Sequence, residues 1–291
     1  MFFMNTMSDV TSSLIDLALL EDVGEDLKKG DVTSLYFVPE DKKSSAYIYA
    51  KADGVLAGMD VAIEVFRRVD AGIEIRQLKA DGEEFCAGER ILEIGGSARS
   101  ILTAERTALN FLQRLSGVAT QTRRYVERTK GTPAKVLDTR KTTPGWRALE
   151  KKAVVAGGGC NHRMGLYDRA MVKDNHLIAQ NQLEALQAAI DHLHDDRKGV
   201  EVEIEADTLE QVQAFLGLNG VDYILLDNMD NETMRKAVQL RDECSSSISL
   251  EASGGITLDT IAGVAATGVD FISVGALTHS ALALDLSLEF E

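Results

Sequence analysis

The chain has 291 residues, a formal net charge of −15 and three cysteines. An acidic chain of this kind is a poor match for general binding to nucleic acid or to anionic membranes. The sequence has no run of 18 apolar residues, so it predicts no transmembrane helix. Three widely spaced cysteines favour reduced thiols and a cytoplasmic location over a disulfide framework or a zinc site.

The N-terminal 95 residues carry mixed helix and strand patterns. The start lacks the charged region and long apolar core of a secretory signal, and it leaves Met1, Met4 and Met7 open as the first residue. Apolar spacing predicts helices over 11–20 and 61–69. Strand patterns cover 46–50, 73–78 and 90–94, with a hairpin signal at Asp81-Gly82. We expect an α+β unit with an antiparallel sheet, followed by a helix over 100–115 that Gly117 ends.

After Gly131, strand patterns alternate with helical ones. Strands are predicted over 136–138, 200–205, 221–226, 248–250 and 269–274. Helices are predicted over 183–193, 231–243 and 258–266, and Asp207 with Glu210 fits a capping box. This alternation predicts a parallel sheet with right-handed crossovers.

Polar residues follow the ends of these predicted strands, as in a (β/α) barrel whose C-terminal rim carries the chemistry. They are Asp138 to Lys141, Asp227, Ser253 to Gly255, and Gly275. The glycines after the last two strands suit a phosphate cradle, because they let backbone N–H groups approach an anion. Glu203 is mid-strand, and the pattern leaves open whether its side chain points into the mouth or the core.

Cations are concentrated in one part of this acidic chain. Residues 135–173 hold nine Lys or Arg and three Asp or Glu, a net charge of +6. Such a field favours an anionic ligand, although a solvated basic loop and helix is the alternative. Arginine offers a planar fork to carboxylates and phosphates.

The sequence offers no recognisable nucleophilic triad. Cys160 and His162 lack a third orienting group, and His176 and His279 are more typical of structural hydrogen bonds. Glu203 and Asp227 could hold Mg²⁺, which takes one or two carboxylates together with substrate phosphates. The set fits transfer of a phosphorylated sugar from a diphosphate.

Several ordered segments resemble the quinolinate phosphoribosyltransferase family, the decarboxylating pentosyltransferases of NAD biosynthesis. The resemblance covers about residues 14 to 288. Its main segments are Asp138 to Gly145, Gly157 to Arg163, Lys173 to His176, Leu226 to Asn228, Ser253 to Gly255, and Val274 to Ser280. Shorter ones are Glu21 to Gly24, Gly30 to Ser34, Thr103 to Arg106, and Leu115 to Gly117.

The resemblance implies an architecture and an activity. We expect an N-terminal α/β sandwich domain over 1–117, joined by the returning tail 278–291. Residues 118–277 would form an incomplete, seven-stranded α/β barrel of the type II phosphoribosyltransferase kind. The implied reaction converts quinolinate and PRPP to nicotinate mononucleotide, diphosphate and CO₂ with Mg²⁺. The implied assembly is a homodimer with a shared site, and assembly beyond the dimer is left open.

The resemblance also implies residue roles. Quinolinate would be bound by Arg140, His162, Arg163 and Lys173, with Arg106 supplied by the partner subunit. Lys141, Glu203 and Asp227 would be the catalytic groups that face PRPP, and the two carboxylates would hold its metal. The phosphate of PRPP would be held by Ser253, Gly254, Gly255, Gly275, Ala276 and His279.

Two departures and four alternatives accompany this interpretation. Trp146 stands where an aliphatic residue is expected, and Glu201 and Glu205 share the alternating face of Glu203. The alternatives are a paralogue associated with molybdate transport, a nicotinate phosphoribosyltransferase, a Schiff-base aldolase using Lys141 or Lys173, and a phosphate-binding scaffold. The intact Asp138 to Thr143 and Asn161 to Arg163 segments argue against the first of these.

Overall fold

The computed structural model describes residues 7–173 and 182–291, with side chains described for 10–173 and 183–291. These residues form two compact units, which are described separately. The first unit comprises the chain up to Arg123, Thr142–Gly158 and Leu277–Glu291, and the second comprises Arg124–Lys141 and Gly159–Ala276. The predictions for His176 and for the first residue lie outside the described residues. The predicted division after residue 117 stays a prediction.

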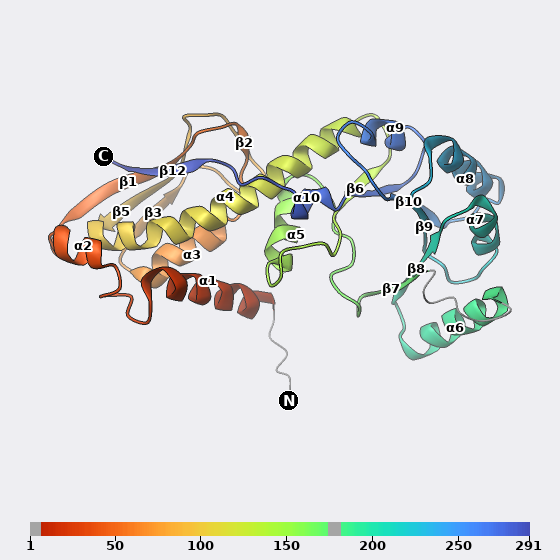
Figure 1. Ribbon diagram of the computed structural model, residues 1–291, viewed down its shortest axis with the longest axis horizontal. Helices are drawn as coiled ribbons and strands as arrows, with labels where there is room; N and C mark the ends of the chain where they lie inside the picture. The colour runs from red at the N-terminus through yellow and green to blue at the C-terminus, as the bar shows by residue number, and fades with distance from the viewer. Residues whose placement is uncertain (1–6, 174–181) are drawn as a thin grey trace. The chain divides into compact units, whose positions relative to one another are not determined.

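An antiparallel sheet forms the centre of the first unit, as predicted. Its order is β12-β1-β5-β3, and its strands are β1 (Lys43–Ala50), β3 (Glu74–Gln77), β5 (Arg90–Ser97) and β12 (Leu286–Phe290). The C-terminal strand β12 runs beside β1, with Phe290 opposite Ala46 (Figure 1). Two further short strands, β2 (Gly54–Val55) and β4 (Glu84–Phe85), pair with each other. The Asp81-Gly82 turn therefore leads into β4 before the chain reaches β5.

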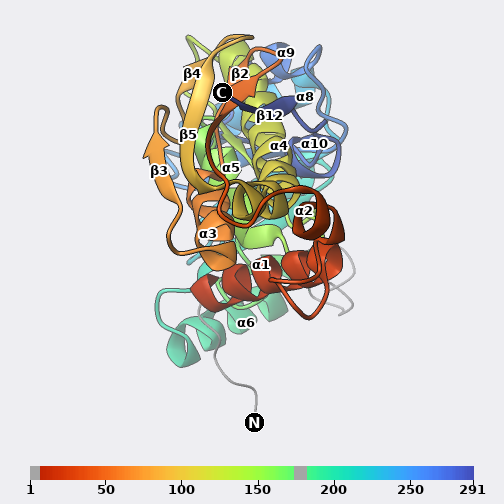
Figure 2. The ribbon, with the colours of Figure 1, turned by 90° about the vertical axis from the view of Figure 1, so that its left-hand side faces the viewer.

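Helices complete the first unit. They are α1 (Met7–Val23), α2 (Val32–Phe37), α3 (Met59–Val69), α4 (Ala98–Arg128), α5 (Arg147–Ala156) and α10 (Ala276–His279). Figures 1 and 2 show α3 and α4 on the same side of the strands, with α1 beyond α3. In α3 the apolar stripe of Ala62, Val65 and Phe66 is fully buried, as expected for an amphipathic helix. The predictions missed α2, which begins after Asp31, whose side chain accepts the N–H of Ser34.

The prediction that Gly117 ends a helix is wrong. Helix α4 continues through this position to Arg128. A Cβ atom at Gly117 would lie 2.0 Å from the carbonyl oxygen of Leu282. The glycine therefore allows the C-terminal segment to approach the helix closely, a tertiary requirement that a local helix-stop rule does not detect.

A six-stranded parallel sheet forms the second unit, which confirms the predicted α/β fold class. Its order is β6-β11-β10-β9-β8-β7. The strands are β6 (Lys135–Leu137), β7 (Arg169–Val172), β8 (Glu201–Ala206), β9 (Tyr223–Asp227), β10 (Ser249–Ser253) and β11 (Phe271–Ser273). A parallel bridge from Leu137 to Cys160 stands where a seventh strand was expected. The predictions missed β7.

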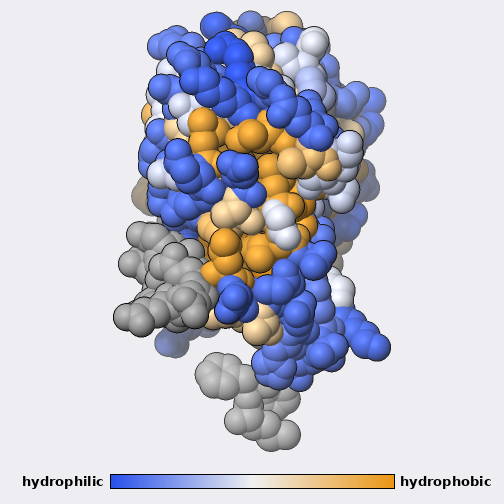
Figure 3. Space-filling view, turned by 90° about the vertical axis from the view of Figure 1, so that its right-hand side faces the viewer, coloured by the Kyte–Doolittle hydropathy of each residue, from blue (hydrophilic) through white to orange (hydrophobic). Residues whose placement is uncertain are grey.

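Helices α6 (Gln182–Asp196), α7 (Leu209–Leu216), α8 (Asn231–Glu243) and α9 (Ile261–Ala265) complete this unit. The capping box of α7 is made by Thr208 and Gln211, not by Asp207 and Glu210 as predicted. The hydroxyl group of threonine accepts the N–H three residues on, and the glutamine reaches back. On the side where α6, α7 and α8 lie, apolar side chains gather within a hydrophilic surround (Figure 3).

The two faces of the parallel sheet differ in polarity. On β8, Val202 and Ile204 are buried on the face that meets α7, whereas Glu203 is fully buried on the opposite, inner face. Alternation along a strand places neighbouring side chains on opposite faces. The question that the sequence left open for Glu203 is thereby answered: it lies on the inner face. No helix among the described residues is long and apolar enough to cross a membrane.

Candidate active site

Most of the predicted site residues follow strand ends at one edge of the parallel sheet. Parallel strands bring their carboxyl ends to the same edge. At that edge the chain places Arg140 and Lys141 after β6, Lys173 after β7, Asp227 at the end of β9, Ser253 to Gly255 at and after β10, and Gly275 with Ala276 after β11. Arg140 and Lys141 are exposed, and Asp227 is half-buried.

The sheet curves so that its two edges approach each other. Cys160 bridges to β6 at one edge, and Arg163 follows it by three residues. The guanidinium of Arg163 donates to the carbonyl oxygen of Arg169 at 3.3 Å and contacts Met171 Sδ at 3.4 Å, both on β7 at the other edge. This contact gives the sheet the form of an incomplete barrel with a polar interior.

His162 lies at the centre of that interior. Its Nε2 atom is 3.1 Å from Glu203 Oε2 and 3.5 Å from Glu251 Oε2. Both carboxylates are fully buried, and Glu251 also accepts the hydroxyl of Ser273. The backbone N–H of His162 donates to Asp138 at 2.9 Å, which fixes the residue at the end of β6.

The two carboxylates set the protonation of this cluster. Burial opposes a charged imidazole, but the neighbouring carboxylates of Glu203 and Glu251 outweigh it and raise the pKa of His162 to about 9. The backbone N–H of Arg163 donates to His162 Nδ1 at 2.6 Å, which disfavours a proton on Nδ1. The neutral ring therefore carries its proton on Nε2, toward Glu203.

Glu203 and Glu251 shift in opposite directions. Burial opposes ionisation of Glu203, but His162 and Arg169 outweigh it and lower its pKa. Burial raises the pKa of Glu251, and the charge of Glu203 adds to this effect. Two neighbouring carboxylates with opposite shifts are typical of a functional interior, although structural networks produce them too.

A second basic group borders the cluster. Arg169 Nη1 lies 3.5 Å from Glu203 Oε2, and its Nη2 lies 2.7 Å from Glu201 Oε2. Its guanidinium also stacks over the ring of Tyr223 at 4.0 Å. Burial lowers the pKa of Arg163, and the charge of Arg140 acts in the same direction. The positive charges of Arg140 and Arg163 therefore repel each other, and an anionic ligand between them would relieve this repulsion.

The strand register does not bring Glu203 and Asp227 together. Glu203 is opposite Tyr223, four residues before Asp227, which separates the two by roughly 13 Å along the strands. Ligand atoms of His162, Glu203 and Glu251 lie within 4.8 Å of one another, a spacing that suits a metal ion. Arg169 already neutralises Glu203, so this set is a poor fit for Mg²⁺. Asp227 at the open edge fits better.

A glycine cradle follows β10. Gly254 and Gly255 have φ angles of +97° and +60°. The left-handed φ of Gly254 favours glycine, and a Cβ atom there would also lie 3.0 Å from the backbone nitrogen of Asn228, beside the end of β9. Ser253, Gly254 and Gly255 line a cavity of about 540 Å³ together with residues of α8 and α9. Its glycines agree with the predicted phosphate role, which stays a prediction.

Lys173 is engaged by Glu205. The ammonium group contacts Glu205 Oε2, one strand along, and about two fifths of the lysine side chain is exposed. An anionic ligand would compete with this carboxylate for the lysine. Arg106 and His279 belong to the first unit, where both are exposed.

Sequence reasoning missed Arg169, Glu251 and Ser273 as members of the cluster. The signal was present in the strands: Glu251 alternates with buried Leu250 and Ala252, as Glu203 does with Val202 and Ile204. A buried parallel strand that alternates acidic and apolar residues has one polar face, and here that face lines the interior.

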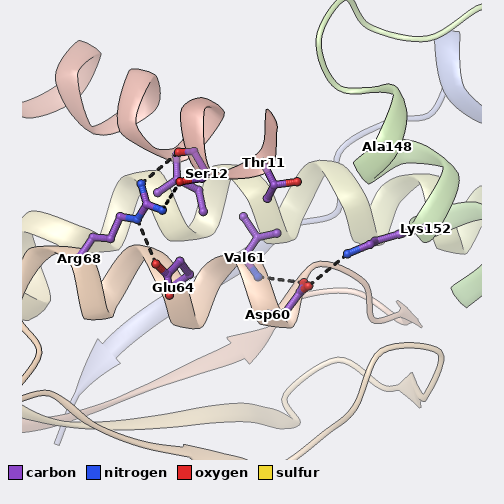
Figure 4. A pocket seen from close by; sticks show the side chains of 9 residues that line it. Thr11, Ser12, Asp60, Val61, Glu64, Arg68, Ala148 and Lys152 are labelled. Carbon is purple, nitrogen blue, oxygen red and sulfur yellow. Dashed lines mark hydrogen bonds and ion pairs between the residues drawn. The ribbon is translucent and has the colours of Figure 1, made fainter. Parts of the chain in front are cut away.

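A separate cavity in the first unit lies between α1, α3 and α5 (Figure 4). Its volume is about 320 Å³. Its charged groups pair with one another: Arg68 donates to Glu64 at 3.0 Å and to Ser12, and Lys152 lies 3.5 Å from Asp60. The cavity is therefore lined by two basic and two acidic side chains whose charges balance.

Family models account for nearly the whole chain. The N-terminal domain of quinolinate phosphoribosyl transferase matches residues 31–116, and its C-terminal domain matches residues 118–289. The chain belongs to the quinolinate phosphoribosyltransferase family. A probable nicotinate-nucleotide pyrophosphorylase [carboxylating] of Bacillus subtilis is 42% identical over 281 residues, covering 95% of this chain and 92% of that protein. The Mycobacterium leprae enzyme of that name is 42% identical over 272 residues, covering 91% and 93%.

Solved structures of this family share the fold. The nicotinate-nucleotide pyrophosphorylase of Francisella tularensis superimposes with a TM-score of 0.89 at 37% identity, covering 99% of this chain and 98% of that one. Human nicotinic acid phosphoribosyltransferase has a TM-score of 0.56 at 14% identity, covering 91% of this chain and 74% of that one. The second likeness shows the fold alone.

Proposed function

We propose that this protein is a quinolinate phosphoribosyltransferase of the decarboxylating kind, which makes nicotinate mononucleotide for NAD biosynthesis. The observation that carries the proposal is a set of four basic residues that follow strands, or the Cys160 bridge, at one edge of the parallel sheet, in a chain whose net charge is −15: Arg140, Lys141, Arg163 and Lys173. Quinolinate has two adjacent carboxylates, and arginine and lysine bind carboxylates through charge-assisted hydrogen bonds. Membership of the family supports the same reaction.

The reaction needs no protein nucleophile. The pyridine nitrogen attacks C1 of PRPP, and the bond from C1 to the diphosphate oxygen breaks through an oxocarbenium-like state. The ring nitrogen is then cationic. The bond to the 2-carboxylate breaks next, its electron pair stays on the ring carbon beside that nitrogen, CO₂ leaves, and the carbon takes a proton. Such a site works by positioning and by charge.

The residues divide by substrate. We assign quinolinate to Arg140, His162, Arg163 and Lys173, with Arg106 of a second subunit as a further ligand. We assign PRPP to Lys141, to Ser253 with Gly254 and Gly255, and to Gly275, Ala276 and His279. The edge position of Asp227 supports it as the protein ligand of Mg²⁺. When bound with PRPP, Mg²⁺ would neutralise charge on the leaving diphosphate.

Glu203 serves differently in this proposal. It holds His162 and Arg169 by its negative charge, since it lies 3.1 Å and 3.5 Å from them. His162 thereby keeps one orientation at the base of the quinolinate site. We propose a homodimer for the assembly and a cytoplasmic location. The three cysteines are free, which agrees with a reducing compartment.

A turnover assay tests the reaction. Purified protein would be incubated with quinolinate, PRPP and Mg²⁺, and nicotinate mononucleotide and CO₂ would be quantified. We expect equal amounts of the two products, and none of the mononucleotide from nicotinic acid in a parallel reaction. Product from nicotinic acid alone would move the protein to the neighbouring transferase, and no product from either would refute the proposed function.

A further inference from the structure

An ion pair of the first unit joins α4 to α5. Arg114 Nη2 lies 2.7 Å from Glu150 Oε1, and the Glu150 side chain is fully buried. Burying the Glu150 carboxylate costs desolvation energy, so the pair is weak evidence for added stability. The clearer effect of this pair is on the geometry of the groups around it.

Glu150 fixes the segment that follows Lys141. Its carboxylate accepts the N–H of Thr143 at 3.1 Å and the hydroxyl of Thr143 at 2.9 Å. Thr143 is two residues after Lys141. Trp146 anchors the same segment, because its ring stacks on Phe111 of α4 with the centroids 4.8 Å apart. The residue that departs from the family pattern therefore packs against the helix that carries Arg114.

Arg114 fixes the chain on both sides of His279. Its guanidinium donates to the carbonyl oxygen of Thr278 at 2.6 Å and to that of Ala281 at 2.7 Å. These two carbonyls flank His279 in the sequence. Arginine can make all these bonds at once, because its donors form a rigid planar fork. One side chain thus ties two loops to Glu150.

We infer that Arg114 and Glu150 are positioning residues for PRPP, holding the segment beside Lys141 and the segment around His279 in their binding geometry. This inference rests on the proposed function, in which both segments contact PRPP. Of the residues assigned to quinolinate, only Arg140 adjoins one of these segments in the sequence, and its side chain is exposed. The pair should therefore affect the binding of PRPP more strongly than that of quinolinate.

The variants Arg114→Lys and Thr143→Val test this inference. Lysine keeps the charge opposite Glu150 but loses the fork, and valine removes only the hydroxyl bond. We expect the KM for PRPP to rise about tenfold for Arg114→Lys, as loss of a hydrogen bond from a charged group predicts, and about threefold for Thr143→Val. The Kd for quinolinate, from calorimetry without PRPP, should stay within about twofold of wild type.

Arg123→Lys is the matched control. Arg123 also lies on α4, donates to the carbonyl of Gly157 at 3.1 Å and pairs with Glu84 at 2.9 Å. Its side chain is 29% exposed, against 26% for Arg114, but it holds neither segment. We expect its KM for PRPP to equal that of wild type.

The outcomes separate this inference from the proposed function. An unchanged KM for PRPP in both test variants, beside an active wild type, would overturn it. An equal loss for both substrates with a lowered melting temperature would also overturn it, by showing a folding role alone. A wild type that turns over no quinolinate would refute the proposed function instead, and calorimetry with PRPP on the same variants would still test the pair.

Discussion

His162 Nε2 lies 3.1 Å from Glu203 Oε2 on the inner face of the parallel sheet, and both side chains are buried. Arg169 approaches the same carboxylate oxygen at 3.5 Å. One negative charge therefore serves two basic groups in an interior from which water is largely excluded. The relationship makes Glu203 the residue on which the charge balance of the cluster depends.

Glu203→Gln should destabilise the fold strongly. Removing one partner of a buried charge pair leaves the other uncompensated, which costs about 3–5 kcal/mol. Urea denaturation would measure the change in the free energy of unfolding. Glu201→Gln is the control, because Glu201 also pairs with Arg169 but its side chain is 45% exposed. Its loss should be below about 1 kcal/mol, and equal losses would contradict this account.

The stability of the protein should fall as the pH rises from about 6.5 to about 9. The pKa of His162 is raised from 6.5 to about 9 in the fold, so a proton bound there stabilises the fold fully below pH 6.5. That contribution is lost as the pH rises through the folded pKa, and it amounts to at most about 3 kcal/mol. Urea denaturation across this range would measure it.

His162→Gln provides the comparison for the pH profile. The variant lacks the titrating ring, so its free energy of unfolding should change less over the same range. A wild-type profile as flat as that of the variant would show that the Arg163 N–H keeps the ring neutral throughout.

Arg140→Ala and Lys173→Ala should each abolish detectable quinolinate binding and leave the fold intact. Loss of one partner of a desolvated charge pair weakens binding by about 2–5 kcal/mol. Calorimetry would measure the affinity, and circular dichroism would check the fold. Lys152→Ala is the control, because this lysine pairs with Asp60 in the first unit. Normal quinolinate affinity in both test variants would refute the assignment of Arg140 and Lys173 to quinolinate.

Arg106 should act on the site of a second subunit. It is exposed on α4, and the family resemblance assigns it to the partner's quinolinate. Arg106→Ala and Lys173→Ala proteins should each be inactive alone. Mixed and reassembled, they should recover about a quarter of wild-type activity, because half of the subunits pair randomly with the complementary variant and only one site of each such pair is intact. No recovery would place each site within one subunit.

Local patterns predicted most of the secondary structure. Helix α8 was predicted with its observed bounds, and α1, α3, β1, β8 and β9 within a few residues. The predictions failed where long-range contacts decide the outcome. Gly117 is inside α4 because the carbonyl of Leu282 packs against it, and the α7 cap shifted by one residue to a threonine whose hydroxyl reaches the right N–H.

The sequence by itself determined the order of the site residues, their position at strand ends and the shared face of Glu201, Glu203 and Glu205. These follow from the two-residue period of a strand and from the common direction of parallel strands. Only the tertiary structure decided that Glu203 lies with His162 and Glu251, away from Asp227. It also decided that Arg114 joins Glu150 to Thr278 and Ala281, which follow Arg114 by 164 and 167 residues. Such partners depend on how the sheet curves and where the C-terminal segment packs, and no local period records either.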